Sequence, residues 1–142
     1  GTVYSFGDGK LGKLGVSVIP PTGKDDGGKS SKRKRDKACT PIPIRFPPGG
    51  NAGHYEVVAG DDFTFAVLYV SSEKDVVKNV YSWGAGGEGQ HALNNHLHLR
   101  TPRENEHLMT LISRSTAFSL HCRGSFAALH VRGMNNCGGG GE

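Results

Sequence analysis

The stretch YSFGDGKLG at residues 4–12 returns as YSWGAGGEG at residues 81–89. The two segments, which we call the first and second glycine boxes, share a tyrosine, a serine, an aromatic residue after the serine and three glycines, at a constant offset of 77 residues. A repeat at so long a period is typical of a chain built from recurring structural units. We predict turns at the box glycines and strands at the box aromatics. The turn glycines are Gly7, Gly9, Gly12, Gly84, Gly86 and Gly89, and the strand aromatics are Tyr4, Phe6, Tyr81 and Trp83.

A Thr-Pro pair places an insertion between the two copies. Thr40-Pro41 and Thr101-Pro102 lie 61 residues apart, which is 16 fewer than the boxes, and 16 is the length of the polar stretch 23–38. The spacing from Thr40 to Thr64 and from Thr101 to Ser125 is 24 residues in both copies, and the segments that follow, TFAVL and SFAAL, are alike. We therefore expect residues 23–38 to be a disordered insert in an otherwise regular repeat.

The landmarks divide the chain into two periods within one unit, residues 1–142. The first period covers about residues 7–83 and includes the insert, and the second covers about residues 84–137. Residues 133–142, GMNNCGGGGE, align with residues 79–88 as a third glycine box that is degraded and truncated.

Each period is predicted to be β-structure. Residues 57–60 lead through a turn at Asp61-Asp62, where aspartate is favoured, into the aromatic and β-branched stretch 63–70. A period of about 55–60 residues with glycine turns is typical of propeller blades. We expect an all-β chain that forms about two antiparallel blades of a partial β-propeller.

Residues 103–114 carry a competing helical pattern, with Leu108, Leu111 and Ile112 on one face. The equivalent stretch of the first period, residues 42–49, contains prolines that forbid a helix. We expect the repeat to prevail over the local propensity, and so no helix in the second period.

The glycine boxes, the later Thr-Pro pair and the A-x-L strands at 66–68 and 127–129 together resemble the regulator-of-chromosome-condensation repeat. The likeness covers nearly all of the chain outside the insert. The family's box usually continues G-Q-L-G, whereas this chain has GKLG at 12–15 and GQHA at 89–92, so its repeats are divergent. The resemblance implies a ring of seven blades that presents a protein-binding surface.

Both boxes also match the dinucleotide pattern G-x-G-x-x-G, which needs a helix after the glycines so that its amides face a pyrophosphate. VSVIPP at 16–21 follows the first box and contains two prolines, so we predict blade turns and no bound cofactor. The four histidines His91, His96, His98 and His107 suggest a metal site, but no further ligand stands at a suitable spacing. Ser5 and Ser82 have no base partner. We therefore predict no enzyme, and no catalytic or metal-binding residue.

Apolar runs and cysteine spacing restrict the cellular compartment that we expect for the protein. No run approaches the ~18 apolar residues that span a bilayer, so neither a signal peptide nor a membrane partner is expected. The start at Gly1 resembles a cut end. Cys39, Cys122 and Cys137 are widely spaced and predict neither a disulfide scaffold nor a zinc site, which favours a reducing compartment. We expect the nucleus or the cytoplasm, with the nucleus favoured.

The insert carries the charge of the chain: KSSKRKRDK at 29–37 holds six of the 17 Lys and Arg residues, offset by one Asp. Three interpretations stay open, namely a nuclear-import signal, a contact with nucleic-acid phosphates in chromatin, and a solvated insertion without a role. The candidate contact residues are Lys29, Lys32, Arg33, Lys34, Arg35 and Lys37.

Two functions are compatible with these features. The first is a non-catalytic scaffold for protein–protein interaction, because propeller loops gather at the ring faces and loops concentrate binding residues. The second is a part of a guanine-nucleotide exchange factor for a Ran-like small GTPase with chromatin association, which is the activity of the family's founding member. No residue of this chain matches a specific exchange residue, so the second function rests on the resemblance alone.

The import interpretation predicts that replacing Lys32, Arg33, Lys34 and Arg35 with alanine in a tagged full-length protein lowers its nuclear signal, because an import receptor needs the clustered positive charge. Quantitative fluorescence microscopy of the nuclear and cytoplasmic signal checks this. An unchanged nuclear signal would reject the import role.

Overall fold

The computed structural model describes residues 1–19, 37–48, 53–70 and 76–133. The described chain is mostly antiparallel β-structure, which confirms the all-β prediction at that level. The strands are β1 (Tyr4–Asp8), β2 (Lys37–Pro43), β3 (His54–Ala59), β4 (Phe63–Val70), β5 (Val76–Gly84), β6 (Leu99–Glu104), β7 (Ala117–Arg123) and β8 (Phe126–Arg132), with a short 3-10 turn η1 (Lys10–Gly12) and the helix α1 (Glu106–Ser113). No helix in these residues is long and apolar enough to cross a membrane.

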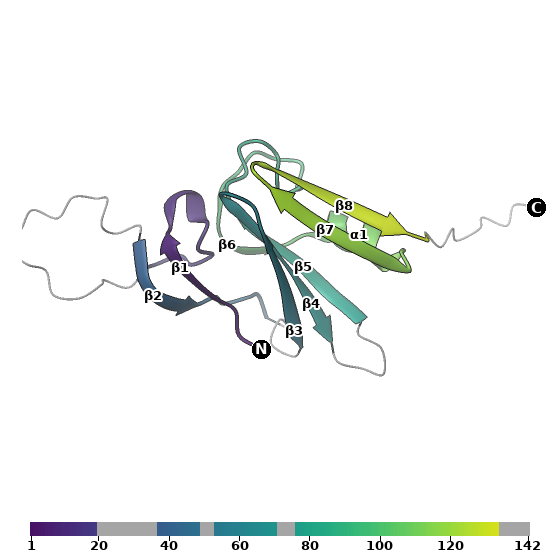
Figure 1. Ribbon diagram of the computed structural model, residues 1–142, viewed down its shortest axis with the longest axis horizontal. Coiled ribbons are helices and arrows are strands. Elements are labelled where there is room, and N and C mark those ends of the chain that lie inside the picture. The colour runs from purple at the N-terminus through teal and green to yellow at the C-terminus, as the bar shows by residue number, and fades with distance from the viewer. Residues whose placement is uncertain (20–36, 49–52, 71–75, 134–142) are drawn as a thin grey trace, which may run out of the picture.

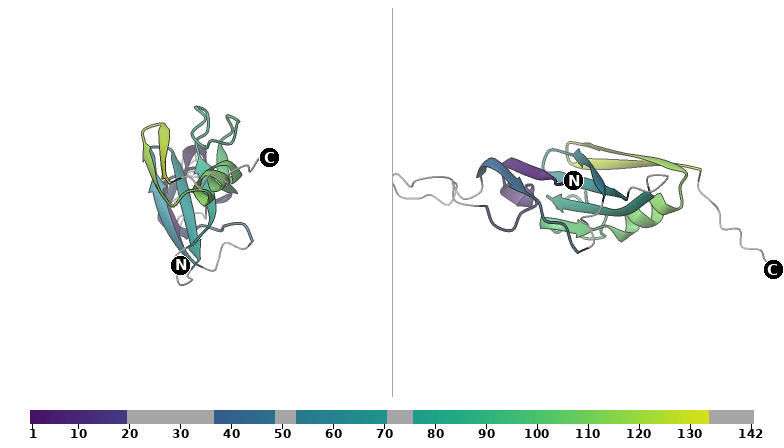
Figure 2. Two further views of the ribbon diagram at one scale, coloured as in Figure 1. Left: turned by 90° about the vertical axis from the view of Figure 1, so that its right-hand side faces the viewer. Right: turned by 90° about the horizontal axis from the view of Figure 1, so that it is seen from below.

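The strands form three antiparallel sheets, β1-β2, β3-β4-β5-β6 and β7-β8 (Figure 1). The four-stranded sheet lies in the middle. On one of its faces it contacts residues next to the β1-β2 pair, namely Val3, Ile44 and Phe46, and on the other face the β7-β8 hairpin packs together with α1. On that second face, α1 lies beside β5 and the hairpin lies beside β3 (Figure 2).

The two glycine boxes pair with their Thr-Pro strands in the same register. Both pairings have an irregularity at the same place, between the serine and the first box glycine, and that glycine has a positive φ of 106° in Gly7 and 101° in Gly84. The first pairing joins Tyr4 to Pro43, Ser5 to Ile42 and Gly7 to Ala38; the second joins Tyr81 to Glu104, Ser82 to Arg103 and Gly84 to Leu99. Each residue of the second pairing stands 77 or 61 positions after its counterpart in the first.

The loops after the two pairings also follow one course. Positive φ angles recur at Gly12 and Gly89, and again at Gly15 and Ala92. The amide of Gly12 donates to the carbonyl of Gly9 at 3.2 Å, and that of Gly89 donates to the carbonyl of Gly86 at 2.9 Å. The repeated glycine letters therefore correspond to a repeated backbone.

Two apolar clusters hold the sheets together. The first lies between the central sheet and residues next to the ends of β1 and β2, and the second lies between the central sheet, α1 and the hairpin. Strand β4 of the central sheet is buried along most of its length, because its alternate side chains enter the two clusters. The first cluster contains Ile44, Ala66, Leu68, Tyr81, Trp83 and Leu99, and the second contains Phe63, Phe65, Val67, Val80, Leu108 and Ile112.

The strand aromatics of the two boxes differ in burial. Tyr81 and Trp83 are 1% and 2% exposed, whereas Tyr4 and Phe6 are 57% and 68% exposed. The side chains of β5 are covered by the first repeat, and no described residue covers β1 in the same way. Whether the aromatic side chains of a glycine box are buried therefore depends on contact with another repeat and not on the motif itself.

The expectation of no helix in the second period was wrong. Residues 106–113 form α1, which buries Leu108 and Ile112 against the central sheet. The side chain of Asn105 caps the helix by accepting a hydrogen bond from the Leu108 amide at 3.1 Å. The first period has Ile44 at the position of this cap and prolines after it, so the helix is specific to the second period.

The structure also shortens the predicted insert at its end. The strand β2 begins at Lys37, and Ala38 is buried where it pairs with Gly7. Residues 23–36 lie outside the described residues, and so does the third glycine box from residue 134 onward.

We predict that Gly84→Ala destabilises the fold more than Gly7→Ala. Both residues have a positive φ, which costs about 1–3 kcal/mol for a residue with a side chain. A Cβ at Gly7 meets open space, whereas one at Gly84 collides with the carbonyl of Asp62 and lies 2.7 Å from Cα of Phe63. The collision adds about 1–3 kcal/mol to the loss at Gly84. Urea unfolding followed by the fluorescence of Trp83 measures both losses, and equal losses would contradict the register described here.

Candidate functional site: the box end

Loops of both glycine boxes and the turns of both hairpins meet at one end of the molecule, at the top of Figure 1. We call this the box end and define it as residues 9–15, 60–62, 85–100 and 123–126, which includes the start of β6. The amide of Asp61 donates to the carbonyl of Gly124 at 3.1 Å, which joins the two hairpin turns. Loops held in this way by a rigid scaffold are a common place for binding residues.

Lys13 ties the first box to the β3–β4 turn. Its Nζ lies 2.8 Å from Oδ1 of Asp62 and 3.1 Å from Oδ2 of Asp8. The hydrogen bonds to Asp62 and Asp8 raise the pKa of the Lys13 ammonium, and the hydrogen bond from Lys13 lowers the pKa of Asp8. The charge of Lys13 is thus neutralised within the protein.

Beside this ion pair is an open cavity of about 420 Å³. Its walls come from the first box, the β3–β4 turn and β6, and include Lys10, Asp62 and Arg100. Lys10 and Arg100 are exposed. Because Lys13 is already paired, these two residues supply the positive charge that an approaching partner meets.

Three of the four histidines weighed as a metal site hold the second box in place. The ring of His98 accepts a hydrogen bond from the Gly86 amide at 3.1 Å, Nδ1 of His96 lies 2.9 Å from the carbonyl of Gly87, and Nε2 of His91 lies 3.1 Å from the carbonyl of Gly84. His107 is exposed on α1. In the described part of the chain, no group of three or more His, Cys, Asp or Glu residues is arranged to hold a metal ion.

His91 is buried, and its protonation state follows from its contacts. Nε2 faces a carbonyl oxygen and so carries the proton, which leaves Nδ1 as an acceptor that has no partner among the described residues. Burial lowers the pKa of His91 below its ordinary value of 6.5, the carbonyl of Gly84 opposes this, and His98 adds to the lowering. His91 is therefore neutral in the folded protein at neutral pH.

Asn105 is the central residue that the sequence analysis missed. Its Nδ2 donates to the carbonyl of His91 at 2.5 Å, its backbone amide donates to the carbonyl of Val80 at 2.8 Å, and its Oδ1 caps α1. A polar residue before an apolar helical pattern is a known start signal. This signal at Asn105 would have predicted a helix that begins directly after it.

The other predicted residues are placed as follows. Lys29, Lys32, Arg33, Lys34 and Arg35 lie outside the described residues, whereas Lys37 is exposed at the start of β2, opposite Asp8. Cys39 is exposed, and burial raises the pKa of the Cys122 thiol to about 11, so this thiol stays protonated. Cys137 lies outside the described residues.

Comparison with known proteins identifies no relative of the chain. Neither a protein-family model nor a curated protein nor a solved structure matches it.

We predict that folding stability falls as the pH drops below about 6.5, and that His91→Leu removes much of this fall. The pKa of His91 is lower in the folded chain than in the unfolded chain, so below 6.5 the unfolded chain takes up the proton first and stability decreases. Leucine already occupies the equivalent position, Leu14, where it is buried. Urea unfolding between pH 5 and 8 measures the slope. The exposed control His130→Leu is expected to keep the wild-type slope, and an unchanged slope in His91→Leu would contradict the prediction.

Proposed function

We propose that the chain forms about two blades of a β-propeller of the regulator-of-chromosome-condensation repeat type, and that it serves as a non-catalytic scaffold for protein–protein interaction. The observation that carries the proposal is the identical pairing of each glycine box with its Thr-Pro strand. Two units that share a register, separated by an apolar cluster, are what a ring of similar sheets requires.

The arrangement of the sheets adds support. The central sheet has an apolar cluster on each of its two faces: residues next to the β1-β2 pair contribute to the first, and α1 and the β7-β8 hairpin contribute to the second. The central sheet thus contributes one face to each cluster. The helix α1 contributes to the second cluster beside β5 and lies outside the box end.

We propose the box end as the binding surface. It carries exposed groups of both charges, among them Lys10 and Glu88 on the box loops and Arg100 at the start of β6. The box glycines and the ion pair of Lys13 fix the backbones of these loops. Charges fixed in this way suit a folded protein surface of complementary charge, because little loop entropy is lost on binding.

The proposal predicts that a double charge reversal at the box end, Lys10→Glu with Arg100→Glu, abolishes capture of at least one protein from a cell extract. A matched reversal at the other end of the hairpin, Arg114→Glu with Arg132→Glu, is expected to leave that capture intact. Quantitative mass spectrometry of proteins bound to the three immobilised chains checks this. If both double variants capture the same proteins as the wild type, the box end is not the binding surface.

A second measurement separates scaffold from exchange factor. Release of a fluorescent guanine nucleotide from a panel of small GTPases is expected to proceed at its intrinsic rate in the presence of the chain. Acceleration for any GTPase of the panel would replace the scaffold by the exchange-factor function.

A further inference from the structure

The outer strands of the three sheets each have one edge that no described strand pairs, and the repeat relates two of these edges, those of β1 and β8. β8 pairs with β7, and within the described residues no strand lies along its other edge. β1 pairs with β2, and its second edge is equally free among the described residues.

The internal repeat relates both edges to a pairing that the chain already makes. Because β1-β2 repeats the register of β5-β6, the free edge of β1 corresponds to the edge of β5 that binds β4. β8 corresponds to β4: the segments SFAAL and TFAVL match, and both strands follow a hairpin turn. The free edge of β8 therefore corresponds to the edge of β4 that binds β5. The two free edges are the two halves of one β4–β5 pairing.

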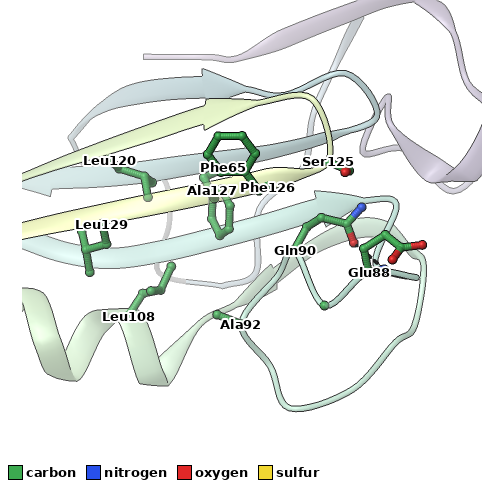
Figure 3. Close-up of a pocket in the computed structure, with 11 residues that line it drawn as sticks. Phe65, Glu88, Gln90, Ala92, Leu108, Leu120, Ser125, Phe126, Ala127 and Leu129 are labelled. Carbon is green, nitrogen blue, oxygen red and sulfur yellow. Dashed lines mark hydrogen bonds between the residues drawn. The ribbon is translucent and has the colours of Figure 1, made fainter.

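A cavity of about 290 Å³ lies beside the free edge of β8. Figure 3 shows it between Leu108 of α1 and the hairpin residues Leu120, Ala127 and Leu129, with Gln90 of the second box loop at one end. It is mostly apolar within, and Glu88 and Ser125 add polar groups to its wall.

In the first repeat the corresponding space is filled by the aromatics of β5. Tyr81 and Trp83 pack there with Ala66 and Leu68, and Nε1 of Trp83 donates to the carbonyl of Lys13 at 3.1 Å. The counterparts of Ala66, Leu68, Lys13 and Gly15 are Ala127, Leu129, Gln90 and Ala92, and all four line the cavity.

The size of the Phe6 side chain of β1 matches the space in this cavity. A Cβ at Gly15 would lie 2.8 Å from Nε1 of Trp83, so the space that Trp83 fills in the first repeat requires glycine at this position. The cavity beside β8 has Ala92 at that position and is therefore narrower by a methyl group. β1 offers Phe6 where β5 has Trp83, and a phenyl ring is smaller and has no N–H that needs an acceptor. Phe6 is 68% exposed and Tyr4 is 57% exposed, so both side chains are accessible.

We propose that β1 of a second copy of this chain adds to the free edge of β8 and inserts Tyr4 and Phe6 into this cavity. The β4–β5 register fixes the pairing: Tyr4 lies opposite Ala127, Ser5 opposite Phe126 and Phe6 opposite Ser125. Strand addition of this kind uses backbone hydrogen bonds for affinity and side-chain pockets for specificity. Since the two surfaces differ, the contact is head-to-tail and produces open chains or rings of copies. The proposal goes beyond the scaffold function: its cavity includes Glu88 of the box end but neither Lys10 nor Arg100, the two charges that the capture experiment reverses.

Sedimentation velocity of the 142-residue chain over a range of concentrations tests the assembly. The wild type is expected to form species larger than a monomer, and Phe6→Asp is expected to weaken association at least ~tenfold, because a carboxylate in the apolar cavity has no partner. Val18 is 75% exposed and lies outside both edges, so Val18→Asp is the control that keeps the wild-type behaviour. A wild type that stays monomeric, a Phe6→Asp chain that assembles normally, or a Val18→Asp chain that fails to assemble would each overturn the proposal.

Disulfide trapping tests the register. In a background without Cys39, Cys122 and Cys137, a Ser5→Cys chain mixed with a Phe126→Cys chain is expected to form a covalent heterodimer on mild oxidation. Ser5→Cys mixed with Ala128→Cys is the control, because that pair is displaced by two residues on the same face and is too far apart for good disulfide geometry. Equal yields from the two mixtures would overturn the proposal.

A shortened chain ending at Gly133 distinguishes the second copy from the chain's own last residues as the occupant. It is expected to assemble as the wild type does, and a large gain in assembly on removal of residues 134–142 would show that these residues occupy the edge instead. Capture of partners at the box end by Phe6→Asp is a separate readout, so a failure of assembly and a failure of the scaffold function are distinguishable.

Discussion

The pairing of a glycine-box strand with its Thr-Pro strand fixes the position of everything else in this fold. In β5-β6, the irregularity before Gly84 and its positive φ turn the chain out of the sheet, so the loop that follows starts at the box end. At the other end of the pairing, β6 delivers Asn105 to the carbonyl of Val80, and α1 begins there. β5 also sends neighbouring side chains to opposite faces: Val80 enters one apolar cluster and Tyr81 the other. One ladder thus positions the helix, the loop and both cores.

The second repeat replaces an apolar contact by a polar one. Leu14 and Ile44 are buried in the first repeat, and the carbonyl of Leu14 accepts a hydrogen bond from Ser5 at 2.6 Å. The second repeat has His91 and Asn105 at these positions, and the side chain of Asn105 donates a hydrogen bond to the carbonyl of His91. The buried hydroxyl of Ser82, which corresponds to Ser5, therefore has no partner among the described residues. A buried hydroxyl without a partner costs about 1–3 kcal/mol. The cap that Asn105 supplies to α1, worth about 1 kcal/mol, offsets part of that cost.

The strands were predictable because their signals are local and occur twice. The box glycines, the Thr-Pro pairs and the A-x-L segments mark the strand positions without any knowledge of the fold. The helix α1 was missed because the prolines of residues 42–49 were carried over to a stretch that does not contain them, although Asn105 and the spacing of Leu108 and Ile112 favour a helix. The ion pair of Lys13 with Asp62 joins residues 49 positions apart, and neither motif predicts the other.

The contrast between β1 and β5 shows what the motif does and does not determine. The same Tyr-Ser-aromatic-Gly sequence makes the same strand in both places, because the strand depends on its own ladder. Burial of its aromatics depends instead on the box loop of another repeat, and covering one large apolar side chain is worth about 1.5–3 kcal/mol. A repeat of this type therefore folds by its own sequence but draws part of its stability from a neighbour. In the proposed assembly the donor strand and the accepting edge are different surfaces, so the β4–β5 register would set a single direction in which copies join.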